Sequence, residues 1–137
     1  MSEIKIFKYY AGSNWYEPSS GKYFESEDPS IGKVWAKLPN CNLDDINIAV
    51  KSAKSAYYEG PWGKMHPAER GRILYRIGDV ISKNAEKIGN IETKDNGKLP
   101  KNITPSLTGW QTESFYYYAG MCDKFEGRLI PSEVPNM

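Results

Sequence analysis

The period of hydrophobic and polar positions changes near residue 40. Before it, short runs of β-forming residues alternate with polar ones and are separated by clusters of Gly, Pro, Ser and Asn. This pattern predicts short strands connected as hairpins over residues 1–40. The predicted strands are 4–9, 15–16, 22–25 and 34–38, and the predicted turns are 11–14, 18–21 and 28–32.

After Pro39 the apolar spacing becomes helical. The first predicted helix has Asn42 as its N-cap and Asp45 in its first turn. His66 occupies an N-cap position and Pro67 the first position of the second helix. The expected apolar faces are Ile46, Ala49, Val50, Ala53, Ala56 and Tyr57 in the first helix, and Ile73, Leu74, Ile77, Val80 and Ile81 in the second.

Two further helices are predicted. Asn84 is expected to cap the third, which Gly97 ends, and Thr104–Pro105 is expected to open the fourth. One side of the fourth carries Leu107, Trp110, Ser114, Tyr117, Tyr118 and Met121. Residues 41–122 are thus predicted to be helical. Residues 123–137 are predicted to contain a strand, over 125–130, that leads into a further part of the fold.

Hairpins followed by about four helices and a final strand predict an α/β fold. Helices of this number need a sheet to cover, and few strands are left to form one. We therefore expect a parallel sheet that this chain does not encode, so that residues 1–137 form one part of a larger domain.

Composition and charge exclude several classes of function. Eighteen Lys and Arg against 17 Asp and Glu leave a net charge of +1, which does not favour nucleic acid or an anionic membrane. Two cysteines do not form a disulfide scaffold. The apolar runs are too short for a bilayer span or a secretory signal, so we expect a cytoplasmic chain without a membrane segment.

The residues alone indicate little catalytic chemistry. Cys41 and Cys122 lack a nearby base in the sequence, and His66, the single histidine, already has an N-cap role. Gly97–Lys98 is followed by Leu99, which does not fit a phosphate-binding loop. The aromatic run 115–118 has no adjacent basic residues, which favours packing over stacking on bases.

Several blocks of sequence together resemble the N-terminal region of aldehyde dehydrogenases. In order along the chain they are Asp28–Val34, Gly60–Trp62, Pro67–Leu74, Glu92–Lys98, Tyr117–Gly120, and Asp123–Gly127 followed by Ile130–Pro131. The resemblance covers about residues 5–135 and implies the N-terminal part of that family's cofactor-binding domain. Asp28 stands where the family more often has Asn.

The resemblance also implies what lies outside this chain. In the family, the catalytic Cys, the general-base Glu, the oxyanion-holding Asn and the NAD(P)-binding strands follow the region that is matched here. Neither Cys41 nor Cys122 lies in a segment similar to the catalytic motif. No catalytic or cofactor-binding residue is therefore assigned, and we expect the chain alone to be inactive and to bind no NAD or NADP.

Two groups of residues inherit candidate roles from the resemblance. Ser106 and Trp110 match positions that line the family's aldehyde tunnel, although Trp110 also suits a core position. Ser26, Glu27 and Asp95 match positions near a structural monovalent cation, for which hard oxygen ligands are suitable. At least one further ligand is expected from outside the chain, so we expect little cation affinity here.

The resemblance implies that the chain is an N-terminal fragment of an NAD(P)-dependent enzyme that oxidises an aldehyde to a carboxylic acid. Its partners would be the remaining aldehyde dehydrogenase segment or subunits, in a homo-oligomer. Two alternatives stay open at this point. The chain could be a module that docks on full-length subunits, or an independent protein that binds a small apolar ligand through its aromatic helix.

Overall fold

A computed structural model of the chain describes residues 4–128. Its strands are β1 (Lys5–Ile6), β2 (Tyr9–Ala11), β3 (Asn14–Tyr16), β4 (Tyr23–Asp28) and β5 (Lys33–Pro39). Its helices are α1 (Leu43–Tyr58), α2 (Pro67–Lys83), α3 (Ala85–Asn96), α4 (Pro100–Ser106) and α5 (Thr112–Met121). A 3₁₀ turn, η1 (Trp62–Lys64), follows α1, and a π-helical turn, η2 (Leu107–Gln111), joins α4 to α5. Strands followed by four helical runs confirm the α/β prediction.

The strands form two small sheets. β4 and β5 make the predicted hairpin, and β2 and β3 make the other. The predicted strand 4–9 is wrong as one element, because β1 leaves the hairpin and pairs in parallel with β5. β5 is therefore the central strand of three, and both of its faces are at least partly covered, with Trp35 against Phe7 at a ring distance of 6.0 Å.

The caps and turns of the helices follow from neighbouring residues. Asn42 caps α1 in a capping box with Asp45, as predicted. The Nδ1 atom of His66 accepts a hydrogen bond from the Ala68 N–H at the start of α2. Gly97 ends α3 in the left-handed conformation with φ of 76°. These local predictions are confirmed.

Three local predictions are wrong. Asn84 does not cap α3 with its side chain, which instead donates to the Val80 carbonyl of α2. The fourth helix begins at Pro100, so Pro105 lies inside it. Both prolines follow residues compatible with a helix start, and the sequence does not show which one is used. Residues 125–128 form no strand, and the rest of the predicted strand lies outside the described residues.

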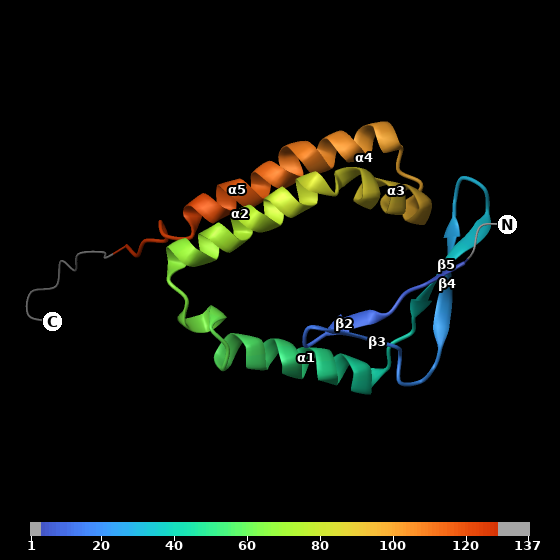
Figure 1. The fold of residues 1–137 in the computed structure, drawn as a ribbon, viewed down its shortest axis with the longest axis horizontal. Coiled ribbons are helices and arrows are strands. Elements are labelled where there is room, and N and C mark those ends of the chain that lie inside the picture. The colour runs from blue at the N-terminus through green and yellow to red at the C-terminus, as the bar shows by residue number, and fades with distance from the viewer. Residues whose placement is uncertain (1–3, 129–137) are drawn as a thin grey trace, which may run out of the picture.

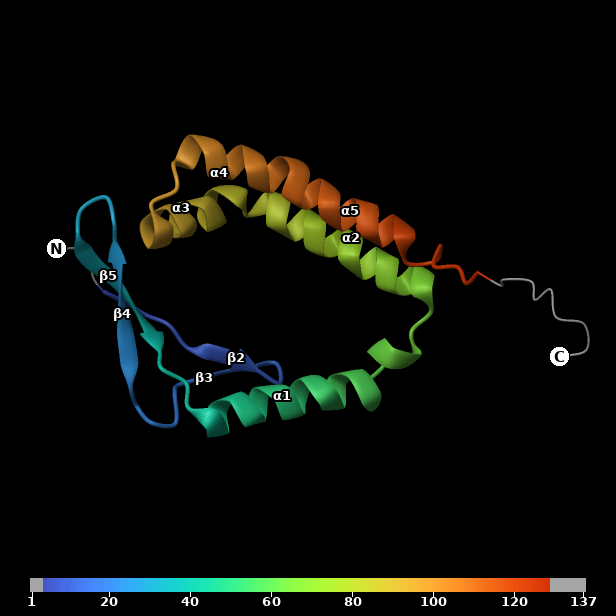
Figure 2. The same ribbon diagram turned by 180° about the vertical axis from the view of Figure 1, so that it is seen from behind.

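The helices pair through small residues. α2 and α5 lie side by side (Figures 1 and 2). An ideal Cβ at Gly71 would lie 2.6 Å from the Ala119 carbonyl oxygen, and one at Gly78 would lie 2.8 Å from the Tyr116 ring. Gly71 and Gly78 are seven residues apart and share one face of α2. The close approach of the two helices depends on these glycines.

The core of the described residues is small. Ala85, Ile103 and Leu107 form its buried cluster, with Ile81 and Ile88 packed against it. The predicted apolar faces are largely exposed. They include Ile46, Val50 and Tyr57 on α1, Ile77 and Val80 on α2, and Trp110, Tyr117, Tyr118 and Met121 on η2 and α5. Among the described helices, none has the length and hydrophobicity to cross a bilayer.

Candidate functional site

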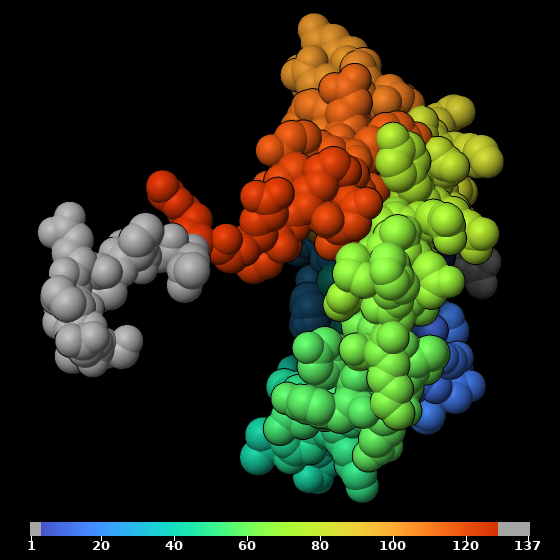
Figure 3. All heavy atoms as spheres, turned by 90° about the vertical axis from the view of Figure 1, so that its left-hand side faces the viewer, coloured from blue at the N-terminus to red at the C-terminus, as the bar shows by residue number. Residues whose placement is uncertain are grey.

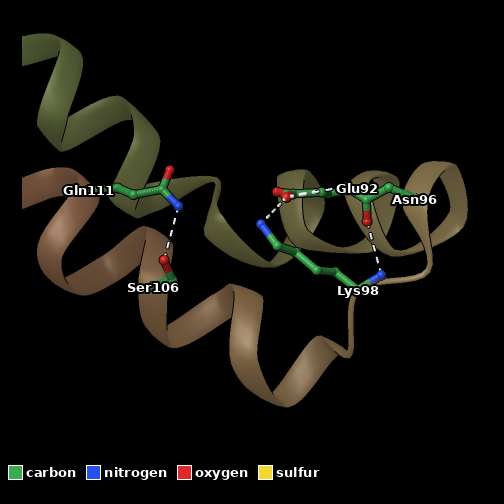
Figure 4. Close-up of polar contacts among 5 residues, drawn as sticks. All are labelled: Glu92, Asn96, Lys98, Ser106 and Gln111. Atoms are coloured by element: carbon green, nitrogen blue, oxygen red, sulfur yellow. Dashed lines mark hydrogen bonds and ion pairs between the residues drawn. The ribbon is translucent and has the colours of Figure 1, made fainter.

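Ser106 and Trp110 lie on the helical run formed by α4, η2 and α5. Ser106 is half-buried at the end of α4 and accepts a hydrogen bond of 3.0 Å from the Gln111 side chain (Figure 4). Trp110 is 66% exposed in η2, so it is not a core residue of the described chain. One segment therefore presents both candidate tunnel residues.

The helical run widens where these residues lie. Pro105 has no N–H to donate to the preceding turn. Two residues after Leu107, Gly109 leaves helical geometry with φ of −96° and ψ of −116°. The Thr112 hydroxyl, which is buried, donates to the Leu107 carbonyl across the widened turn. Single π-helical turns of this kind are frequent at functional sites.

Two of the three candidate cation ligands are in contact. The Ser26 hydroxyl on β4 donates to an Asp95 carboxylate oxygen on α3 at 2.7 Å, across 69 positions of sequence. The same hydroxyl accepts from the Trp35 indole N–H at 3.0 Å. Glu27 is exposed on β4, and no side-chain hydrogen bond joins it to Asp95 within residues 4–128. The structure thus brings Ser26 and Asp95 together but not Glu27.

The Ser26 bridge leads to a stability prediction. We expect Ser26→Ala to lower the free energy of unfolding by about 1 kcal/mol, because it removes both the bond to Asp95 and the acceptor of the Trp35 indole. Ser30→Ala is the matched control, since the Ser30 hydroxyl bonds only locally, to Asp28 of the same turn. Urea unfolding followed by fluorescence measures both. Equal losses would contradict a role of Ser26 in joining β4 to α3.

The block Glu92–Lys98 forms the end of α3 and the turn after it. Figure 4 shows Lys98 reaching back to Glu92, with a Nζ–Oε1 distance of 2.8 Å. The Asn96 side chain accepts from the Lys98 backbone N–H at 2.9 Å, and Gly97 turns the chain between them. The lysine is held by a carboxylate, so this segment closes a helix and does not resemble a phosphate loop.

The cysteines are not activated nucleophiles in this structure. Partial burial, together with the nearby Asp45 carboxylate, raises the pKa of the Cys41 thiol. A raised pKa keeps the sulfur protonated and unreactive. Cys122 points its thiol at the Tyr118 carbonyl, 3.4 Å away. No group of three or more His, Cys, Asp or Glu that could hold a metal occurs among the residues that the structure describes.

An apolar hollow lies beside α5. It has a volume of about 460 Å³ and lies between α2 and the end of α5. Figure 3 shows these two helices in contact, with α1 below them. The walls of the hollow include Leu74, Tyr118, Met121 and Phe125. Phe125 is 98% exposed, which is unusual for so large an apolar side chain. Exposed apolar surface of this kind is typical of an interaction surface.

The comparisons with known proteins identify this arrangement. A model of the aldehyde dehydrogenase family matches residues 15–137. The chain belongs to the aldehyde dehydrogenase family. It is 40% identical over 88% of its length to aldehyde dehydrogenase family 2 member B4, mitochondrial, of Arabidopsis thaliana. It is 38% identical over 83% of its length to (Z)-2-((N-methylformamido)methylene)-5-hydroxybutyrolactone dehydrogenase of Acinetobacter baylyi.

Solved aldehyde dehydrogenases share the fold. The NAD⁺ complex of the Bacillus cereus enzyme superposes with a TM-score of 0.86 and 32% identity over 94% of this chain. The present chain covers 26% of the length of that structure, 22% of the Arabidopsis relative and 23% of the Acinetobacter relative. It therefore corresponds to a portion of the family fold, and the alternative of a separate docking module is not favoured.

Sequence reasoning missed the residues that shape the candidate tunnel segment. Gln111 and Thr112 received no role, yet their side chains bond to Ser106 and to Leu107. Both bonds span five positions, which an ordinary α-helix does not bring together. The one available signal was Pro105 followed by Gly109, two residues that disfavour a regular helix.

Proposed function

We propose that the chain is the part of an NAD(P)-dependent aldehyde dehydrogenase that supplies one wall of the aldehyde tunnel. The complete enzyme would oxidise an aldehyde to a carboxylic acid. The family match over residues 15–137 carries this proposal. The exposed positions of Trp110, Tyr118 and Phe125 support it, since an apolar wall needs a second wall to enclose a substrate.

Catalysis would reside in the remaining polypeptide. The oxidation needs an activated thiolate, an oxyanion donor and a bound nicotinamide. The raised pKa of Cys41 does not fit the first requirement. The sequence contains no dinucleotide fingerprint, so no step through NAD or NADP is assigned to this chain's residues.

The exposed helix faces would pack on that polypeptide and on further subunits. α1 and α5 carry large apolar side chains that the described residues leave uncovered. Surfaces of this kind mark interfaces. We therefore propose a homo-oligomeric enzyme in which α1, α2 and α5 are covered by the rest of the fold.

We also propose a cytoplasmic location for the enzyme. Some relatives are named as cytosolic proteins and others as mitochondrial ones.

Asp95 and Ser26, with Glu27, would contribute oxygen ligands to a monovalent cation. The hydroxyl and carboxylate oxygens already lie 2.7 Å apart and are of the hard type that such ions prefer. Ser26 and Asp95 fit such a donor set, whereas no side-chain hydrogen bond joins Glu27 to Asp95 among the described residues. The remaining ligands would come from outside this chain. We expect weak binding until they are supplied.

Complementation tests the proposed function. The purified chain is assayed for NADH production with several aldehydes, alone and mixed with the part of the Bacillus cereus enzyme that it does not match. We expect no NADH from the chain alone and NADH from the mixture, with co-elution on sizing. Activity of the chain alone would contradict the assignment of catalysis to the other part. A mixture that neither associates nor reacts would contradict the proposed packing.

Trp110→Ala tests the tunnel wall in the active mixture. Removing the indole should widen the tunnel and raise kcat/KM for bulky over small aldehydes by about tenfold. Trp15→Ala is the matched control, because Trp15 is 65% exposed and Trp110 66%, while Trp15 lies on β3. Equal effects of the two variants would show that Trp110 does not face the substrate.

A further inference from the structure

The widened turn between α4 and α5 is held at both ends. Leu107 is 4% exposed and belongs to the buried cluster with Ala85 and Ile103. Thr112 is 3% exposed at the start of α5. Between these anchors, Gly109 departs from helical geometry and Trp110 points outward. The orientation of Trp110 is therefore set by what keeps the turn wide.

One hydrogen bond spans the widened turn from inside. The Thr112 hydroxyl donates to the Leu107 carbonyl, five residues earlier. In a regular helix a threonine hydroxyl reaches the carbonyl three or four residues back. Thr108 does this here, with its hydroxyl 3.2 Å from the Thr104 carbonyl. The longer reach of Thr112 is available only in the π-helical geometry.

The hydrogen bond from the Thr112 hydroxyl to the Leu107 carbonyl is buried, which increases its contribution to stability. A carbonyl that is left without a donor in a buried place costs more than an exposed one, because water cannot replace the lost partner. The second bond across the turn joins Gln111 to Ser106, and both residues are half-buried. The bond made by Thr112 is thus the better shielded of the two.

We propose that Thr112 is a positioning residue, whose hydroxyl holds the turn Leu107–Gln111 open and so fixes the Trp110 indole against the aldehyde. The proposal rests on the proposed function for its second half, the contact with aldehyde. Without the hydroxyl, the turn loses its internal bond and Trp110 can adopt positions about 100° away around the helix axis, the rotation of one residue.

Fluorine NMR tests the first half on the chain itself. The four tryptophans are replaced by 5-fluorotryptophan, and the Trp110 signal is identified with Trp110→Phe. We expect Thr112→Val to shift or broaden the Trp110 signal and to leave the other three unchanged. Thr112→Ser should restore the wild-type signal, because it keeps the hydroxyl. Thr108→Val is the control, with the same chemical change at an exposed threonine.

An unchanged Trp110 signal in Thr112→Val would overturn the proposal. So would a Thr112→Ser signal as altered as that of Thr112→Val, since the methyl group and not the hydroxyl would then matter. Circular dichroism checks that each variant is folded. If the valine variant does not fold, Thr112→Ala removes the same hydroxyl with a smaller side chain and is scored by the same signals.

Kinetics of the complemented enzyme test the second half. We expect Thr112→Val to raise KM for a small aldehyde about fivefold with kcat within twofold, because a mobile indole weakens binding without touching the reacting atoms. Thr112→Ser should restore KM. If the Trp110 signal responds and the aldehyde KM does not, the positioning of Trp110 by Thr112 stands and its place in the tunnel is wrong.

Discussion

Gly71→Val is expected to lower the free energy of unfolding by about 3 kcal/mol. The first added carbon would lie 2.6 Å from the Ala119 carbonyl oxygen, far inside contact distance. That oxygen belongs to the backbone of α5, so a flexible side chain cannot relieve the overlap. The two helices would have to separate along their contact, with loss of the packing around Gly78.

Gly120→Val is the matched control for this prediction. Gly120 lies next to Ala119 on α5, and an added Cβ there would meet nothing within 4 Å. We expect a change close to zero, because the same side chain enters open space and glycine is itself unfavourable in a helix. Urea unfolding followed by circular dichroism measures both variants. Similar losses at the two positions would contradict helix packing through Gly71.

Asp45→Asn is expected to lower the melting temperature by about 10 °C. Asp45 is 1% exposed, and its carboxylate accepts hydrogen bonds from the Asn42 and Ser19 N–H groups and from the Tyr9 hydroxyl. These donors come from the start of α1, the loop before β4, and β2. An amide presents an N–H₂ group to some of them, so one change loosens all three segments.

Asp44→Asn controls for the change of charge. Asp44 is the exposed neighbour in the same first turn of α1, where both acidic residues favour the positive end of the helix. The control should lower the melting temperature by only a degree or two. Differential scanning calorimetry compares the two variants. A loss as large in Asp44→Asn would mean that charge near the helix end, and not the buried network, stabilises this corner.

The same network makes stability depend on pH. Burial acts to raise the pKa of Asp45, but the hydrogen bonds from Asn42, Ser19 and Tyr9 outweigh it and hold that pKa below its ordinary value of 3.8. A lowered pKa stabilises the fold above that value, and this stability is lost as the pH falls through the folded-state pKa. Asp45→Asn should therefore flatten the acid side of the stability curve.

The alkaline side follows from Tyr9. Burial, and then the negative charge of Asp45, raise the pKa of the Tyr9 hydroxyl above 10.0. A raised pKa gives stability that is present below pH 10 and is lost as the pH rises through the folded-state pKa. Loss of the Asp45 charge should weaken this dependence as well. Melting temperatures across pH measure both arms.

The sequence determined the features that depend on near neighbours. Asn42 with Asp45, His66 before Pro67, and Gly97 after α3 were predicted because a cap or turn needs only residues a few positions apart. The family was also readable, since its motifs lie in order along the chain. The positions of Ser106 and Trp110 on one segment follow from that resemblance.

The tertiary structure decided which surfaces meet. Periodicity marked Ile77 and Val80 as the inner face of α2, yet Gly71 and Gly78 make its contact with α5. Hydrophobic spacing identifies the apolar face of a helix, but it does not show whether the surface that packs against this face belongs to the same chain. The pairing of β1 with β5, the Ser26–Asp95 bond and the wide turn held by Thr112 likewise join residues whose proximity is set by packing and helix geometry, which the local pattern does not encode.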